Sequence, residues 1–90
     1  MKLSTKSRYA LEAMVWLAAC APGETANIRQ VSEATGISGS YLEQIFFRLR
    51  KAGLLAALRG AGGGFYPARD LSDITAGDIV RAMEDDATPV

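Results

Sequence analysis

Histidine is absent from this 90-residue sequence, and Cys20 is its only cysteine. These two shortages exclude a disulfide framework, a structural zinc site and histidine-based catalysis within the chain. No nucleophile is paired with a base, so we do not expect an enzyme. The acidic residues towards the C-terminal end lack the spacing of a calcium-binding loop.

Long apolar runs and an excess of one charge are missing as well. Residues 11–21 are apolar but too few to span a membrane, and they lack the context of a signal peptide, so we expect a cytoplasmic protein. The formal net charge is zero. However, residues 1–69 contain nine Lys and Arg against four Asp and Glu, a net charge of +5, and residues 70–90 contain one against six, a net charge of −5. Only the basic part of the chain is suited to contact phosphates.

Residues 31–51 carry the pattern of a helix, a three-residue turn and a second helix. Gly36 is placed to end the first helix in the left-handed conformation, and Ser38 is a good N-cap for the second. In the second helix, expected over residues 39–52, apolar residues recur at the spacing of one buried face. The opposite face carries Ser40, Glu43, Gln44, Phe47 and Lys51, with Arg48 and Arg50 at its flanks. A helix-turn-helix presents such a face to the major groove of DNA, although an ordinary helical hairpin has the same pattern.

Two residues on this outer face have several possible roles. Phe47 contacts thymine methyl groups, packs against a neighbouring hairpin or marks an interface, and the sequence does not decide among the three. Glu43 is unfavourable beside phosphates. It therefore accepts a hydrogen bond from cytosine, rejects sites that offer no donor, or pairs with Arg50 or Lys51.

A first helix is expected from Ser4 or Thr5 to about Cys20, which we interpret as a small core residue. This helix has a second apolar side, formed by Leu11, Val15 and Ala18. We expect that a partner subunit or a segment outside the chain covers it. Basic residues crowd the N-terminal end, where they either contact DNA phosphates or are simply solvated: Lys2, Lys6 and Arg8.

The remaining elements are a short helix, a hairpin and a last helix. Asn27 with Gln30 is a capping pair for a helix over residues 28–35, and Thr75 caps a helix over residues 76–84. Residues 54–59 and 65–67 are expected to be the strands of a hairpin with a glycine-rich tip. The domain is expected to span residues 1–84, with a frayed tail at residues 85–90.

The glycine-rich tip does not form a nucleotide-binding loop. Such a loop runs directly into a helix, which Pro67 excludes here. The tip is either a flexible surface loop or a wing that lies along DNA. Arg59 at its base favours the wing, because arginine enters narrow minor grooves readily.

Several stretches, spread over essentially the whole chain, together resemble the IscR-type regulators of the Rrf-two family. They are MKLS and RYA within residues 1–10, GIS, SYLEQ and LRKAGL within residues 36–54, RGxGGG at residues 59–64 and ITxGDIV at residues 74–80. The resemblance implies a winged helix-turn-helix of a bacterial transcription regulator or repressor, dimeric on palindromic operators. It implies that the helix at 39–52 lies in the major groove and the wing at 59–65 at the minor groove.

Carried onto matching positions, the resemblance implies major-groove contacts by Ser38, Ser40, Tyr41, Glu43 and Gln44, and minor-groove contacts by Arg59, Gly60, Gly62 and Gly63. To these we add, as phosphate contacts, the basic residues Lys2, Lys6, Arg8, Arg50 and Lys51. Family members hold an iron–sulfur cluster with three clustered cysteines and continue into a dimerisation helix. Both lie beyond the position of Val90, so no cofactor is expected within these 90 residues, and a homodimer is expected if such a helix exists.

We therefore predict an α+β fold, mostly α: a winged helix-turn-helix with a three-helix core, a two-stranded hairpin and a C-terminal helix. Its predicted function is sequence-specific DNA binding in transcription regulation. The alternative is a winged-helix module that binds proteins instead of DNA, which the zero net charge keeps open.

Overall fold

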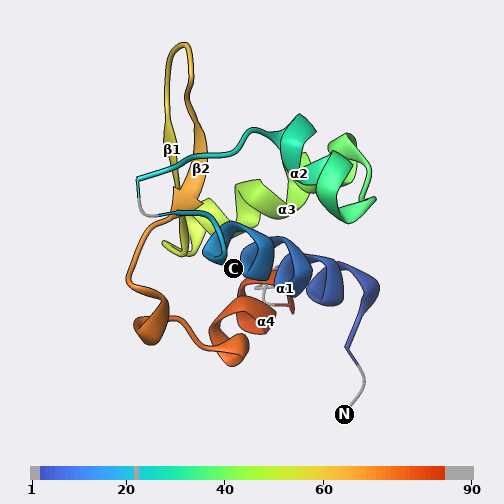
Figure 1. Ribbon diagram of the computed structural model, residues 1–90. Helices are drawn as coiled ribbons and strands as arrows, with labels where there is room; N and C mark the ends of the chain where they lie inside the picture. Colours follow the sequence, from blue (N-terminus) through green and yellow to red (C-terminus); the bar gives the residue numbers. More distant parts are fainter. Residues whose placement is uncertain (1–2, 22, 85–90) are drawn as a thin grey trace.

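Side-chain caps fix where the helices begin in the computed structural model, which describes residues 3–21 and 23–84 (Figure 1). The helices are α1 (Thr5–Ala18), α2 (Ile28–Thr35), α3 (Gly39–Lys51) and α4 (Ala76–Glu84). Their caps are Ser4, Asn27, Ser38 and Thr75. Each cap oxygen accepts a backbone N–H of the first turn at 2.8 to 3.2 Å, which satisfies a donor that the helix leaves unpaired. These caps confirm the predicted helix starts.

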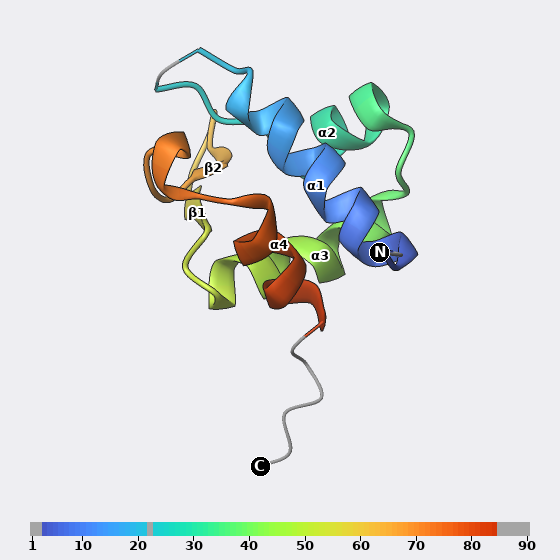
Figure 2. The same cartoon turned by 90° about the horizontal axis from the view of Figure 1, so that it is seen from below.

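The inner face of α3 forms a large part of the core. Leu42, Ile45, Phe46 and Leu49 are at most 1% exposed, as their spacing predicted. α1 lies across this face and contacts α2, α3 and α4, and α4 lies beside α1 in both views (Figures 1 and 2). The opposite face of α3 is left uncovered by the helices, which makes it available to a partner.

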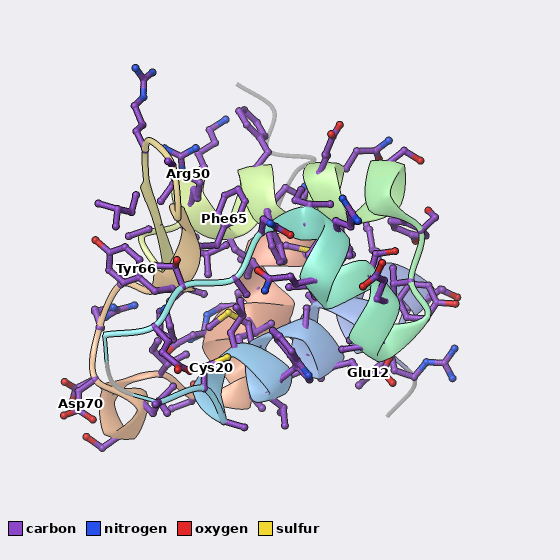
Figure 3. All side chains as sticks on the ribbon, turned by 45° about the horizontal axis from the view of Figure 1, so that its top comes forward. Glu12, Cys20, Arg50, Phe65, Tyr66 and Asp70 are labelled. Carbon is purple, nitrogen blue, oxygen red and sulfur yellow. The ribbon has the colours of Figure 1, made fainter. Side chains whose placement is uncertain are left out.

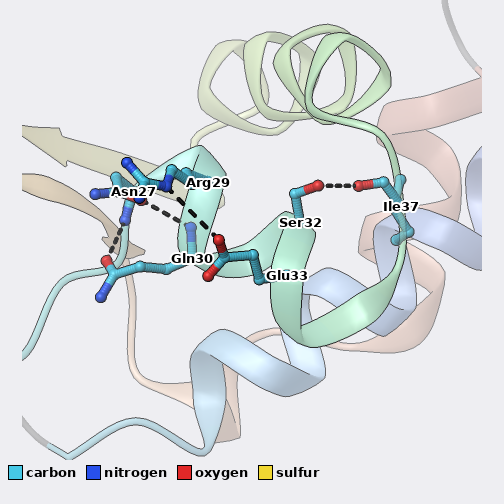
Figure 4. Close-up of polar contacts among 6 residues, drawn as sticks. All are labelled: Asn27, Arg29, Gln30, Ser32, Glu33 and Ile37. Atoms are coloured by element: carbon cyan, nitrogen blue, oxygen red, sulfur yellow. Dashed lines mark hydrogen bonds and ion pairs between the residues drawn. The ribbon is translucent and has the colours of Figure 1, made fainter.

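The turn between α2 and α3 is rigidly defined. Gly36 has a φ of +81°, and its N–H donates to the carbonyl of Ser32 at 2.8 Å. Ile37 is 4% exposed, and its carbonyl accepts a hydrogen bond from the Ser32 hydroxyl at 2.6 Å (Figure 4). A non-glycine residue at position 36 would be strained in this conformation. The predicted three-residue turn is therefore confirmed.

The predicted hairpin is present, but its first strand is shorter than expected and its second strand begins one residue earlier, at Gly64. β1 (Leu55–Leu58) pairs antiparallel with β2 (Gly64–Pro67), so the predicted strand at 54–59 is too long at both ends. Leu54 instead follows α3 and closes its C-terminal end, because its N–H donates to the carbonyl of Leu49 at 2.9 Å. Ala26, in the loop before α2, forms an isolated β-bridge with Phe65 of β2 through two backbone hydrogen bonds of 2.7 and 3.1 Å. This bridge was not predicted.

The first helix differs from its prediction in two respects. α1 ends at Ala18, and Cys20 lies beyond it, half-buried, with its thiol donating to the carbonyl of Trp16 at 3.7 Å. On the predicted second apolar side, Leu11 and Ala18 are half-buried within the chain and Val15 is 68% exposed. The uncovered part of this side is thus smaller than expected and centres on Val15.

The first and last helices are joined by polar contacts as well as by packing. The hydroxyls of Ser4 and Ser7 each donate to a carboxylate oxygen of Glu84 at 2.5 Å. Ser7 is fully buried, so its hydroxyl depends on this acceptor. Between the hairpin and α4, residues Leu71–Asp73 form a 3₁₀ helix, η1, that was not predicted.

None of the helices within residues 3–21 and 23–84 has the length and apolar character needed to cross a membrane. The tail at residues 85–90 and Lys2, for which the sequence made predictions, lie outside the described residues.

Candidate nucleic-acid interface

The outer ridge of α3 is formed by four side chains at the spacing i, i+4, i+7 and i+11. They are Ser40, Gln44, Phe47 and Lys51, all exposed. On a helical wheel they lie opposite the buried face of α3, which places them along one line parallel to the helix axis. A helix can bring such a ridge into a groove of DNA without disturbing its packing on the core.

Glu43 and Arg50 lie beside this ridge, and both are exposed. In the part of the chain that the structure describes, Glu43 makes no ion pair, and the alternative in which it pairs with Arg50 or Lys51 is absent. Figure 3 shows Arg50 on the C-terminal part of α3, on the side where the hairpin rises. Glu43 is therefore an exposed carboxylate on an otherwise neutral or basic surface.

Ser38 and Tyr41, both predicted at the major groove, have structural roles in addition. Ser38 is the N-cap of α3. Tyr41 is half-buried, and its ring meets Tyr9 of α1 edge-on, with 5.3 Å between the ring centroids. The family resemblance assigned Tyr41 to the major groove, but the crossing of α1 over α3, which decides its burial, could not be read from the sequence pattern.

The basic N-terminal end of α1 is brought towards the start of α3 by the same tyrosine contact. Arg8 is exposed, with its guanidinium carbon 5.8 Å from the centre of the Tyr9 ring. Lys6, two residues earlier on the helix, is half-buried. The tyrosine contact thus links the end of α1 that carries Arg8 to the first turn of α3.

The tip of the hairpin depends on glycine because two backbones come close together. A Cβ atom on Gly63 would lie 2.1 Å from the carbonyl oxygen of Leu58, and one on Gly64 would lie 2.6 Å from the backbone of Ala26. Gly60 and Gly62, in the left-handed region, complete the turn. The hairpin, called the wing below (residues 55–67), therefore lies in close backbone contact with the loop before α2.

Arg59 follows β1 directly and is exposed at the base of this tight tip. A further hydrogen bond, from the Thr25 hydroxyl to the carbonyl of Gly62 at 3.1 Å, ties the tip to the loop before α2. In Figure 1 the wing rises well above the helices, so its tip is accessible. The predicted minor-groove residues are thus together at one end of the molecule.

A groove of about 950 Å³ between α3 and α4 was not predicted. Its basic lining comes from Arg48 and Lys51 of α3, from Arg69 after the wing and from Arg81 of α4. Arg48 donates to the carbonyl of Met83 at 3.4 Å, and Arg81 pairs with Asp78 at 2.6 Å. The arginines are visible in the sequence, but they are far apart along it. No local pattern predicts that they come together beside α3.

The acidic residues with shifted pKa values are structural caps. The backbone N–H of Thr75 lowers the pKa of Asp78, and the backbone N–H of Ser72 lowers the pKa of Asp70. Among the described residues, no three His, Cys, Asp or Glu side chains lie close enough together to hold a metal ion. These carboxylates therefore act as caps of η1 and α4.

This geometry, an exposed helix ridge beside a glycine-tipped wing, agrees with the comparison to known families. The family Rrf2, described as "Iron-dependent Transcriptional regulator", matches residues 3–90. The chain belongs to the Rrf2 family. The predicted resemblance and the predicted winged helix-turn-helix fold are thereby confirmed.

Two Rrf2 relatives are both named "HTH-type transcriptional regulator IscR". The protein of Vibrio atlanticus is 46% identical over 90 residues, and that of Escherichia coli K12 is 43% identical. Each match covers 98% of this chain but 52% and 56% of the relative, so the chain spans about half the length of these relatives.

Solved structures of the family have the same fold. The IscR of T. potens superposes with a TM-score of 0.87 at 43% identity, covering 93% of this chain and 61% of that one. CymR, the global cysteine regulator of B. subtilis, gives 0.89 at 39% identity, covering 100% and 70%. With sequence identities of 43% and 39%, these structures resemble the chain in sequence as well as in fold.

The iron in the family description has no matching ligands in this chain. Its 90 residues contain one cysteine and no histidine, and Cys20 lies between α1 and the loop before α2 without a second thiol. A cluster held by several cysteines therefore does not fit these residues, and its ligands would have to come from elsewhere.

Proposed function

We propose that this chain is the DNA-binding part of an Rrf2 transcriptional regulator, with α3 in the major groove and the wing at the minor groove. The observation that supports this most directly is that the helix carrying the exposed ridge and the wing carrying Arg59 pack against each other. α3 contacts β1, and Phe46 of α3 meets Phe65 of β2 edge-on, at 4.8 Å between ring centroids. A helix and a wing joined in this way are suited to occupy two neighbouring grooves at once.

Phosphate contacts in this proposal come from exposed or partly exposed cations on three elements. They are Lys6 and Arg8 of α1, Arg50 and Lys51 of α3, and Arg59 of the wing, with Lys2 as an additional candidate. Such contacts orient the protein and supply salt-dependent affinity without reading sequence. The glycines at 60, 62 and 63 allow the wing backbone to come close to the DNA.

Base reading is proposed for the polar side chains near the start and middle of α3. Gln44 can pair with adenine through two hydrogen bonds, and Ser40 can donate or accept. Glu43 accepts a hydrogen bond from cytosine N4, and a site without such a donor leaves its carboxylate desolvated and repelled by phosphates. Glu43 thereby contributes selectivity rather than affinity. Ser38 and Tyr41 are proposed to contact DNA at the edge of this surface.

The whole protein is proposed to act in the cytoplasm as a homodimer on a palindromic operator, and to work as a repressor without enzymatic activity. The exposed Val15 side of α1 is the surface in this chain that a second subunit would cover. In relatives of the IscR type, any cluster would be held outside these residues.

Selection from a library of randomised duplex DNA tests this proposal. The protein should enrich a defined sequence, and Gln44→Ala should bind that sequence more weakly while its general affinity for DNA at low salt is retained. If the protein binds no duplex even at 50 mM salt, the DNA-binding proposal is wrong, and a protein partner for the same surface is indicated instead.

A further inference from the structure

Phe47 is a large apolar side chain that the fold does not use. It is 66% exposed in the middle of the polar ridge of α3, whereas its neighbour Phe46 is 1% exposed and packs edge-on against Phe65 of the wing, at 4.8 Å between ring centroids. The core is therefore complete without Phe47. Covering an exposed phenylalanine with a partner contributes strongly to the free energy of binding, because an aromatic side chain buries a large apolar area.

The structure removes one of the roles that the sequence left open for Phe47. The wing meets α3 through Phe46, and among the described residues Phe47 takes part in no aromatic contact. Its ring instead borders the groove between α3 and α4, together with Gln44 and Lys51. It therefore faces outwards, in the direction of the proposed DNA.

The position of Phe47 on the ridge relates it to specific base pairs. At 1.5 Å per residue it lies about 4.5 Å along the helix axis from Gln44 and about 6 Å from Lys51. Base pairs are spaced by about 3.4 Å, so Phe47 lies roughly one to two base steps from the base that Gln44 would contact. It is flanked on one side by a side chain that reads bases and on the other by a cation suited to phosphate.

We propose that Phe47 is a specificity-determining residue that recognises thymine by covering its C5-methyl group in the major groove. This inference rests on the function proposed above. Thymine is the one unmodified base with a methyl group on its major-groove edge, so an apolar ring there favours thymine over the other three. Lys51, an exposed cation that lines the same groove as Phe47, complements the phosphates beside the major groove and so favours DNA over an apolar protein surface as the occupant.

Replacing thymine by uracil tests the proposal, because uracil lacks the methyl group and keeps the same hydrogen bonds. After selection of a preferred sequence, each thymine is replaced in turn and the dissociation constant is measured for wild type, Phe47→Ala and Phe47→Leu. For wild type we expect about a fourfold loss at one thymine per bound domain, the effect of one buried methyl-sized group. Phe47→Ala should bind the thymine and uracil duplexes equally, and Phe47→Leu should retain part of the difference.

Thermal unfolding serves as the control for the fold. Because Phe47 is exposed, the melting temperature of Phe47→Ala should stay within a few degrees of wild type. If wild type tolerates uracil at every position, or if Phe47→Ala shows the same loss as wild type, the inference is wrong while the proposed function stands. If wild type selects no DNA sequence, both are wrong.

Discussion

Arg59→Ala provides the most direct measure of how this chain contacts DNA. Arg59 is exposed at the base of the wing tip, and it is one of five described cations proposed to meet phosphates. Each neutralised phosphate contributes about −0.9 to the slope of log K against log salt concentration, so five contacts give a slope of about −4.5 per domain. Between 50 and 200 mM salt, binding by one domain should weaken about 500-fold for wild type and about 150-fold for Arg59→Ala.

Fluorescence anisotropy of a labelled duplex at several salt concentrations measures this slope. The matched control is Leu71→Glu, which changes the net charge by the same single unit. Leu71 is 44% exposed on η1, at the end of the molecule away from the wing tip (Figure 1). The control should leave the slope unchanged. Equal slopes for wild type and Arg59→Ala, or an equal reduction in the control, would refute the reasoning, since the wing would then make no local contact.

Three further predictions concern base reading, association and the cap of α4. Glu43→Ala should keep general DNA affinity and lose about 1–3 kcal/mol of discrimination at one or two positions in a competition assay over a randomised operator library. Gln44→Ala should instead lose affinity for the preferred site, and an unchanged base preference in Glu43→Ala would contradict its role. Val15→Glu should weaken self-association of the protein in analytical ultracentrifugation, and an unchanged oligomeric state and solubility would exclude Val15 from an interface. Asp78→Ala should lower the melting temperature at pH 7 more than Asp73→Ala does. Because the backbone N–H at the start of α4 lowers the pKa of Asp78 below 3.8, its stabilising contribution is present above that pH and is lost as the pH falls further, so the difference should disappear in strong acid.

Features that depend on residues close in sequence could be predicted. The Asn27–Gln30 pair fixes the start of α2 by two hydrogen bonds within one turn, which Figure 4 shows together with the Arg29–Glu33 ion pair at 3.6 Å. The left-handed Gly36 likewise ends α2 without help from the rest of the chain. Caps, turns and helix periodicity are local, so the order and type of the main elements followed from them.

Features that depend on distant residues could not be predicted in the same way. Ala26 forms a β-bridge with Phe65 of the wing, yet nothing in the sequence around this loop alanine predicts a strand. In the candidate site, the helical periodicity of the sequence predicted which side chains of α3 are exposed along its outer ridge. The burial of Tyr41 and the meeting of Arg69 and Arg81 beside α3 followed only from how helices and loops cross.

The contact between Ser7 and Glu84 has a consequence for synthesis of the protein on the ribosome. The two residues are separated by 77 positions. At about 5–20 residues per second, roughly 4–15 s pass between their incorporation, and emergence from the exit tunnel adds to this. During that interval the Ser7 hydroxyl lacks its acceptor, and the side of α1 that packs against α4 stays uncovered. The nascent domain can therefore complete its core only after α4 has emerged, and until then chaperones and proteases have access to its first helix.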